Sequence, residues 1–172
     1  RAIYIACEGE TVTASCTINI APNTFNLSIY YEQTTAAPEY SNFFTYGGTL
    51  VITPGASNPD GSVDLSGSNT FTCTGNGATG DCTTETAGSV TFSAEGTLVF
   101  PGTGTPELHL ELTPDFNTSI TIYCPDDPPL TNPFMMGGEP YEFVIPMENG
   151  HTIEKAGGYG VITDLIRYVL TF

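Results

Sequence analysis

Hydrophobic and polar residues alternate along most of this chain. Successive side chains of a β-strand point to opposite faces of a sheet, so alternation with a period of two predicts strands that bury one face. Thr, Val, Ile, Tyr and Phe supply the β-branched and aromatic residues that favour strands, and Gly and Pro separate the runs. The candidate strands are residues 2–6, 11–20, 25–32, 49–53, 69–74, 89–94, 97–100, 107–113, 119–124, 141–146 and 161–172.

Roughly ten short strands with little or no helix indicate an all-β protein, and turns at this spacing are typical of an antiparallel β-sandwich, either Ig-like or jelly-roll-like. The chain has 172 residues, 40% of them hydrophobic, which suffices for one core. We therefore expect a single domain over residues 1–172. The last run also shows helical spacing, but the alternation of Ile166, Tyr168, Leu170 and Phe172 favours a strand.

Charge narrows the range of partners. Arg1, Lys155 and Arg167 are the only basic residues apart from histidine, against 19 acidic ones, for a net charge of −16. Nucleic acids and anionic membrane surfaces are bound through Lys and Arg, so the sequence predicts neither partner. No apolar run approaches the roughly 20 residues that span a bilayer, so membrane insertion is not expected either. The Thr-rich, Lys-poor composition indicates a secreted or cell-surface protein.

Five cysteines without a CxxC pair, in a chain with only two histidines, favour disulfides over a metal site. The glycine-rich stretch between Cys73 and Cys82 predicts a loop that brings these two together. Cys7 and Cys16 can pair only across a wide loop, because a tight turn would separate them beyond the disulfide limit of about 7 Å. Cys16 and Cys124 form an alternative pair that would join two sheets. The fifth cysteine is expected to be free and buried, or bonded to another chain.

No motif predicts catalysis, and we expect a non-enzyme. Neither His109 nor His151 lies in a nucleophile motif, and His109 should point outward from its strand because it alternates with leucines. Paired carboxylates of a glycoside hydrolase depend on spatial separation, so a small secreted hydrolase stays as a third reading. Its candidate acids are Glu107, Glu111, Asp115, Glu139 and Glu142.

Calcium is the one candidate cofactor. Asn58, Asp60, Ser62 and Asp64 place oxygen-bearing side chains at alternate positions of a turn-rich segment, and Ca²⁺ takes such ligands. Asp126 and Asp127 are a second candidate. The spacing is not that of an EF-hand.

Other surface features suggest recognition without specifying a ligand. Asn26 and Asn117 begin glycosylation sequons, at a frequency expected by chance. Segments 54–67 and 125–138 are turn-rich and long enough to be recognition loops, or ordinary connections between sheets. The tyrosines available to stack on a sugar ring are Tyr30, Tyr31, Tyr40 and Tyr46.

These patterns support two function hypotheses. The first is an extracellular structural subunit of a cell-surface assembly, such as a filament, a pilus or a coat, that joins copies of itself or other surface proteins by β-strand contacts. The alternating terminal strands supply the expected contacts: Ile3, Ile5, Ile166, Tyr168, Leu170 and Phe172. The alternative is a monomeric extracellular binding or adhesion module, calcium-dependent or not, that recognises glycan or protein.

Overall fold

The computed structural model describes residues 2–8, 15–134 and 140–172, and only the backbone of residues 2–8, 15–20, 134, 158 and 159. These residues form antiparallel strands and no helix, which confirms the all-β prediction. The strands are β1 (Ala2–Glu8), β2 (Ser15–Ala21), β3 (Phe25–Ala37), β4 (Tyr40–Ser57), β5 (Val63–Thr79), β6 (Cys82–Val99), β7 (Glu107–Tyr123), β8 (Leu130–Phe134), β9 (Tyr141–Pro146), β10 (Thr152–Tyr159) and β11 (Ile162–Thr171).

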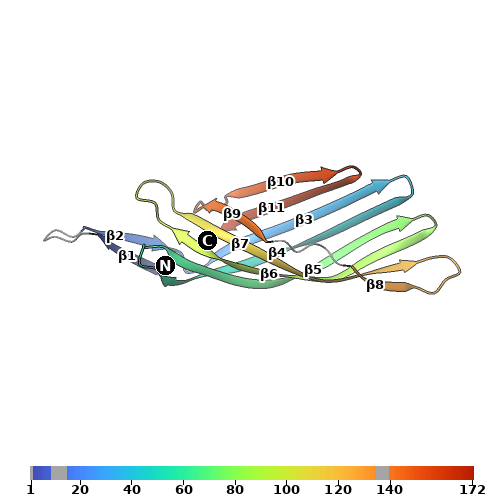
Figure 1. Ribbon diagram of the computed structural model, residues 1–172, viewed down its shortest axis with the longest axis horizontal. Helices are drawn as coiled ribbons and strands as arrows, with labels where there is room; N and C mark the ends of the chain where they lie inside the picture. The colour runs from blue at the N-terminus through green and yellow to red at the C-terminus, as the bar shows by residue number, and fades with distance from the viewer. Residues whose placement is uncertain (1, 9–14, 135–139) are drawn as a thin grey trace.

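Nine of these strands belong to one sheet rather than to the two sheets of the expected sandwich. Their order is β10-β11-β3-β4-β5-β6-β7-β8, and β9 pairs with the other half of β7. The hairpins β3–β4, β5–β6, β7–β8 and β10–β11 extend in the same direction and give the molecule an elongated shape (Figure 1). No apolar helix of membrane-spanning length occurs among the described residues.

The strands are longer than the alternation predicts. β6 covers the run predicted at 89–94 and all but the last residue of that at 97–100, and β7 does the same for the runs at 107–113 and 119–124. The β5–β6 hairpin closes with a two-residue turn at Gly80 and Asp81. Gly80 has a positive φ of 56°, which glycine adopts readily because it has no side chain. Segment 54–67, predicted as a recognition loop or an ordinary connection between sheets, consists mainly of the ends of β4 and β5.

The sheet curls around its apolar face. Fully buried side chains come from β3, β4, β5, β6, β7, β9 and β11, and the largest are Phe25, Phe44, Phe92, Leu27, Ile29, Leu50, Ile52, Leu98, Leu108, Leu112, Ile145 and Leu170. The rings of Phe143 on β9 and Tyr168 on β11 lie 5.0 Å apart, although these strands stand near opposite ends of the strand order. The curled sheet thus encloses its own core without a second sheet.

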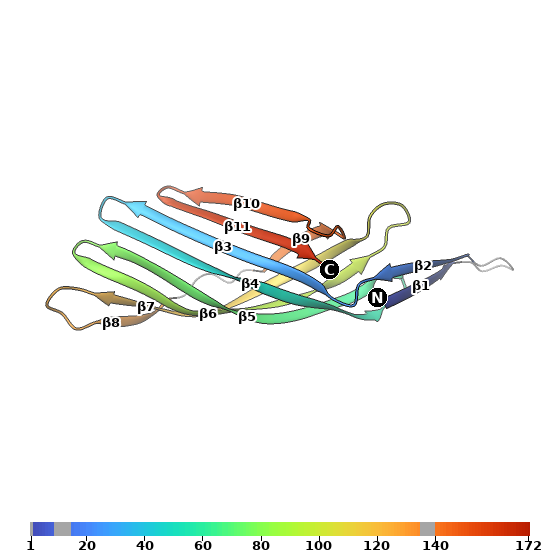
Figure 2. The same ribbon diagram turned by 180° about the vertical axis from the view of Figure 1, so that it is seen from behind.

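A separate two-stranded hairpin, β1–β2, stands apart from this body. In the described part of the chain the two strands pair only with each other, and Ile3 faces Ile20 while Ile5 faces Ile18. Three residues, 22–24, link the hairpin to β3, and Ala21 at its base is buried. Figures 1 and 2 show the hairpin projecting from the end of the body opposite the four hairpin tips, and we call it the arm.

The cysteine pairing differs from the prediction. Cys82 is bonded to Cys124, with Cα atoms 4.2 Å apart, and Cys73 is free and buried. The predicted pairing of Cys73 with Cys82 is wrong, because β5 and β6 continue as strands to Thr79 and Cys82 and carry Cys73 opposite Gly88 instead. The disulfide is compatible with an extracellular protein.

The backbone register bears on the two remaining cysteines. Cys7 and Cys16 are direct partners in the arm, because Glu8 pairs with Ser15 and the chain makes no tight turn at Glu8. The alternative pairing of Cys16 with Cys124 is wrong, since Cys124 is bonded to Cys82.

Candidate functional site

Two strand edges remain open where the curled sheet meets itself. Among the described residues, β9 pairs only with β7 and β10 pairs only with β11, and no backbone hydrogen bond joins β9 to β10. Between these edges lies a cavity of about 280 Å³, which we call the seam. Its lining residues are Pro140, Tyr141, Glu142, Phe143, Ile153, Lys155, Ile166 and Tyr168. An open edge beside an apolar cavity is a surface that another β-strand can join.

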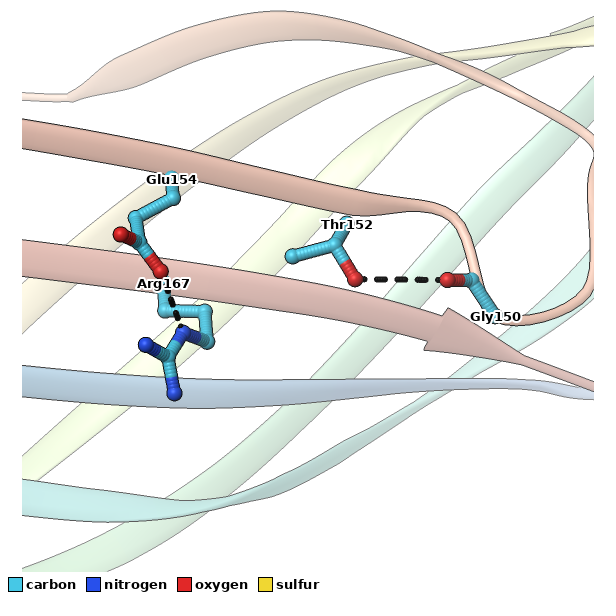
Figure 3. Close-up of polar contacts among 4 residues, drawn as sticks. All are labelled: Gly150, Thr152, Glu154 and Arg167. Atoms are coloured by element: carbon cyan, nitrogen blue, oxygen red, sulfur yellow. Dashed lines mark hydrogen bonds and ion pairs between the residues drawn. The ribbon is translucent and has the colours of Figure 1, made fainter.

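The outward side of β10 is tied to β11. Arg167 Nε lies 2.6 Å from Glu154 Oε2, and these residues are direct register partners (Figure 3). The hydroxyl of Thr152 donates a hydrogen bond of 3.3 Å to the carbonyl oxygen of Gly150 at the start of the strand. Both Arg167 and Glu154 are about half exposed, so the pair contributes at most about 1 kcal/mol. Arg167, one of only three Lys and Arg residues in the chain, is thus engaged in an ion pair.

Lys155, by contrast, has no ion-pair partner. The ion pairs of the described residues join His109 to Glu107, His151 to Glu148 and Arg167 to Glu154. Lys155 is exposed, and it is the only lysine in a chain with net charge −16. The seam therefore combines an apolar lining with the charges of Lys155 and Glu142, and neither takes part in an ion pair among the described residues.

A buried carboxylate oxygen lies beside the seam. Asp164 Oδ1 is buried and has no hydrogen-bond partner. Asp164 pairs with Gly157, where an added Cβ would collide with this oxygen, so the missing side chain makes room for the carboxylate. Burial raises the pKa of Tyr141 in the seam wall, and the negative charge of Asp164 raises it further. Buried carboxylates without donors are costly, so this oxygen marks a position where a donor would stabilise the fold.

Tyrosines form a cluster next to this carboxylate. The Tyr31 and Tyr46 rings stack with centroids 4.9 Å apart. Burial raises the pKa of Tyr31 to about 12, and it raises the pKa of Tyr46 and Tyr168 further. Tyr46 is only 3% exposed, so it presents no face to a sugar ring, contrary to the stacking role considered from the sequence.

A second concave surface lies on the outer face of β6, β7 and β9. Its volume is about 560 Å³, and its walls include Glu95, His109, Glu111 and Glu142. The register aligns the three glutamates in one row, with Glu95 opposite Glu111 and Glu111 opposite Glu142. Like charges directly opposite each other destabilise a sheet, so this acidic groove favours a positively charged ligand.

The acids proposed as a hydrolase pair are only partly brought together. Glu111 and Glu142 are neighbours, whereas Glu107 pairs with Val99 and Pro146, and Asp115 pairs with Thr91. Glu139 lies outside the described residues. His109 is exposed, as predicted, and its Nε2 lies 3.2 Å from Glu107 Oε2. No group of three His, Cys, Asp or Glu residues in the described ranges could hold a metal ion.

The calcium candidate loop is held by its own hydrogen bonds. The Asn58 amide donates to Ser62 Oγ at 3.1 Å and to Asp64 Oδ1 at 2.8 Å. Asp60 Oδ1 accepts from the backbone N–H and the hydroxyl of Ser62, and these bonds lower the Asp60 pKa. Asn58 thus points its NH₂ group, a donor, toward the other residues, and Asp60 and Asp64 already accept hydrogen bonds. Calcium binding by this loop stays a prediction from the sequence.

The other candidates lie on separate parts of the sheet. Asp126 and Asp127 occupy the exposed turn between β7 and β8. Asn26 is half-buried in β3 and Asn117 is exposed in β7. Segment 125–138 contains this turn and then β8, while its residues 135–138 lie outside the described ranges.

Three of the four C-terminal contact residues lie in or against the core, and the fourth, Phe172, is exposed. β11 lies between β10 and β3, so it is not an edge strand. Tyr168 and Leu170 are buried, Ile166 packs against the core, and the Phe172 ring contacts that of Phe25 at 5.8 Å. As an internal strand β11 already has both neighbours, so these residues cannot join another subunit by strand pairing. Their role in side-chain contacts between subunits stays a prediction.

Comparisons of this chain with protein-family models, with curated proteins and with solved structures find no match.

Proposed function

We propose that this protein is a non-catalytic extracellular structural subunit that joins copies of itself into a cell-surface assembly, such as a filament, a pilus or a coat. One observation carries the proposal. The arm β1–β2 projects from the body, and its register pairs isoleucine positions with isoleucine positions. A two-stranded hairpin alone is at best marginally stable in water, so an apolar hairpin of this kind gains stability by packing on a partner.

The body has the properties that such a subunit needs. In this proposal the curled sheet acts as a sandwich-like rigid core, with β9 packed over β11 through Phe143 and Tyr168. The Cys82–Cys124 disulfide supports an extracellular location. The net charge of −16 keeps bodies apart in solution, so association must occur through specific short-range contacts.

The oligomeric state of the full chain tests this function. Light scattering and negative-stain electron microscopy should show oligomers or filaments at micromolar concentrations. The variant Ile5→Lys, which disrupts the Ile5–Ile18 pair position, should lower the average mass to that of the monomer. A wild-type chain that stays monomeric up to the highest soluble concentration would contradict the proposal.

A matched control separates the apolar contact from the charge. Asn19→Lys adds the same charge to the same hairpin, at a position that pairs with Tyr4 and has the opposite parity to Ile5 and Ile18. This variant should assemble like the wild type. Equal loss of assembly in both variants would mean that added charge, rather than the isoleucine positions, disrupts association.

The acidic groove favours a second function, that of a monomeric binding module. Its volume of about 560 Å³ lies within the range of ligand sites, and the row of Glu95, Glu111 and Glu142 suits a Lys- or Arg-bearing protein segment better than a neutral glycan. Binding of an oligolysine peptide, measured by calorimetry, should weaken in Glu111→Gln. An unchanged affinity in that variant would remove the groove from consideration.

A further inference from the structure

The arm needs an acceptor surface, and the seam has the required features. Two strand edges face an apolar cavity there, and each edge offers N–H and C=O groups without backbone partners among the described residues. We propose that the seam between β9 and β10 receives the arm of a second copy by β-strand addition. This inference rests on the proposed assembly function and names the site on the second copy that completes it.

The size and lining of the seam suit side chains of a strand. Its volume of about 280 Å³ lies just below the range of small-molecule sites, which is about 300–1,000 Å³. Phe143, Ile153 and Ile166 provide apolar walls that are only partly buried in the isolated chain. Alternate side chains of an added strand enter such pockets, while main-chain hydrogen bonds form along the edges.

Charge selects the arm as the occupant. The first 21 residues carry one basic and two acidic residues, whereas the other 151 carry two basic and 17 acidic residues. The arm is therefore the part of the chain that a second, strongly acidic body repels least. Both basic residues of the body, Lys155 and Arg167, lie on β10 and β11 next to the seam. Lys155 is free of ion pairs and can meet the acidic Glu8 at the end of β1.

The geometry points to the arm of another molecule rather than the chain's own arm. Only residues 22–24 link β2 to β3, and Ala21 is buried at the base. Both views show the arm directed away from the body (Figures 1 and 2). Arm and seam are different surfaces, so their contact is head-to-tail, and repetition of it builds an open chain of subunits.

The test uses a seam variant, Lys155→Glu, in the full chain. Lys155 is exposed and has no ion-pair partner, so the substitution should leave folding intact. We expect the self-association constant, measured by sedimentation, to fall about tenfold or more. The control is Val51→Glu/Thr72→Glu, which makes the same change in net charge at two exposed positions on β4 and β5, away from the seam, and should assemble normally.

Mixing identifies the direction of the contact. The arm variant Ile5→Lys keeps an intact seam, and the seam variant keeps an intact arm, so an equimolar mixture should form dimers that stop at two subunits. If the wild type does not associate, the proposed function fails. If the wild type and the seam variant both assemble while the arm variant does not, the function stands and the seam is not the acceptor. Lack of dimers in the mixture would also overturn the head-to-tail contact.

Discussion

Gly48 is a position where one methyl group should disturb the curled core. It lies in β4 with its missing side chain directed at the ring of Phe71 on β5, and an added Cβ would lie 2.6 Å from Cε1 and 3.0 Å from Cγ of that ring. Phe71 is 4% exposed and its ring centroid lies 5.6 Å from that of Phe92. The ring cannot move toward solvent without leaving this contact.

The expected effect of Gly48→Ala is the difference between two terms. Overpacking a core costs about 1–3 kcal/mol. Replacing Gly by Ala in a compatible conformation stabilises by about 0.4–1 kcal/mol, because the unfolded chain loses freedom. The midpoints of the two terms differ by about 1.3 kcal/mol, a net destabilisation that lowers Tm by about 3–5 °C for a domain of this size.

Urea unfolding followed by circular dichroism measures this difference. Gly55→Ala is the matched control in the same strand, because its added Cβ would lie 3.6 Å from the carbonyl oxygen of Asp64, an ordinary contact. We expect Gly55→Ala to be neutral or stabilising, and Gly48→Ala/Phe71→Leu to recover part of the loss. Equal stability of Gly48→Ala and Gly55→Ala would refute the close packing of Phe71 over Gly48.

Three further predictions concern the disulfides and the tyrosines. Removal of the Cys82–Cys124 bridge by Cys82→Ser/Cys124→Ser should lower the free energy of unfolding by about 4 kcal/mol in the chain-entropy model, since 42 residues separate the cysteines; a loss below about 1 kcal/mol in urea unfolding would contradict this. Alkylation of the native chain should label no cysteine, because Cys73 is buried and burial raises its pKa to about 11. After unfolding without reductant, peptide mapping should find one free thiol, Cys73, because backbone pairing of Cys7 with Cys16 predicts a second disulfide; two more free thiols would rule that bridge out. Stability should fall as pH rises above about 10, where tyrosines of the unfolded chain ionise while Tyr31, Tyr46 and Tyr168 stay protonated in the fold. Tyrosinate absorbance during a pH titration checks this, and full ionisation of all tyrosines near pH 10 with the fold intact would disprove it.

Local patterns explain why the strand content was predictable and the strand lengths were not. Alternation of apolar and polar residues with a period of two indicates a strand with one buried face. The bounds predicted for β9, 141–146, are those of the structure. The outer parts of the hairpins, such as residues 75–79, are rich in Gly and Thr and show no such alternation. They are strands because a neighbouring strand supplies their hydrogen bonds, and that information is not local.

The two strands missing from the prediction show the same limit. β8 contains Pro133, and β10 contains Gly157 and Gly158, so both resemble turns in sequence. Both have a neighbour on one side only, where such residues are tolerated. Because the sequence does not predict β10, it leaves β11 as an exposed edge strand. Its alternating residues are then predicted to contact other subunits.

The surfaces that matter for function depend on register and curvature. Glu95, Glu111 and Glu142 are far apart in the chain, and only the pairing of β6, β7 and β9 aligns them. The seam exists because the sheet curls until β9 approaches β11. Ile3 and Ile5 could be singled out from their alternation, but their position on a projecting arm follows from the absence of other strand partners for β1 and β2 in the described chain.

Lys155 allows two physical accounts of the seam to be separated. A lysine on an edge strand discourages pairing between molecules, because insertion of another strand would bury its charge. If that were its role, Lys155→Ala should increase association. If instead the seam receives the arm of a second copy, Lys155 supplies attraction toward Glu8 in a body of otherwise negative charge, and Lys155→Ala should weaken association.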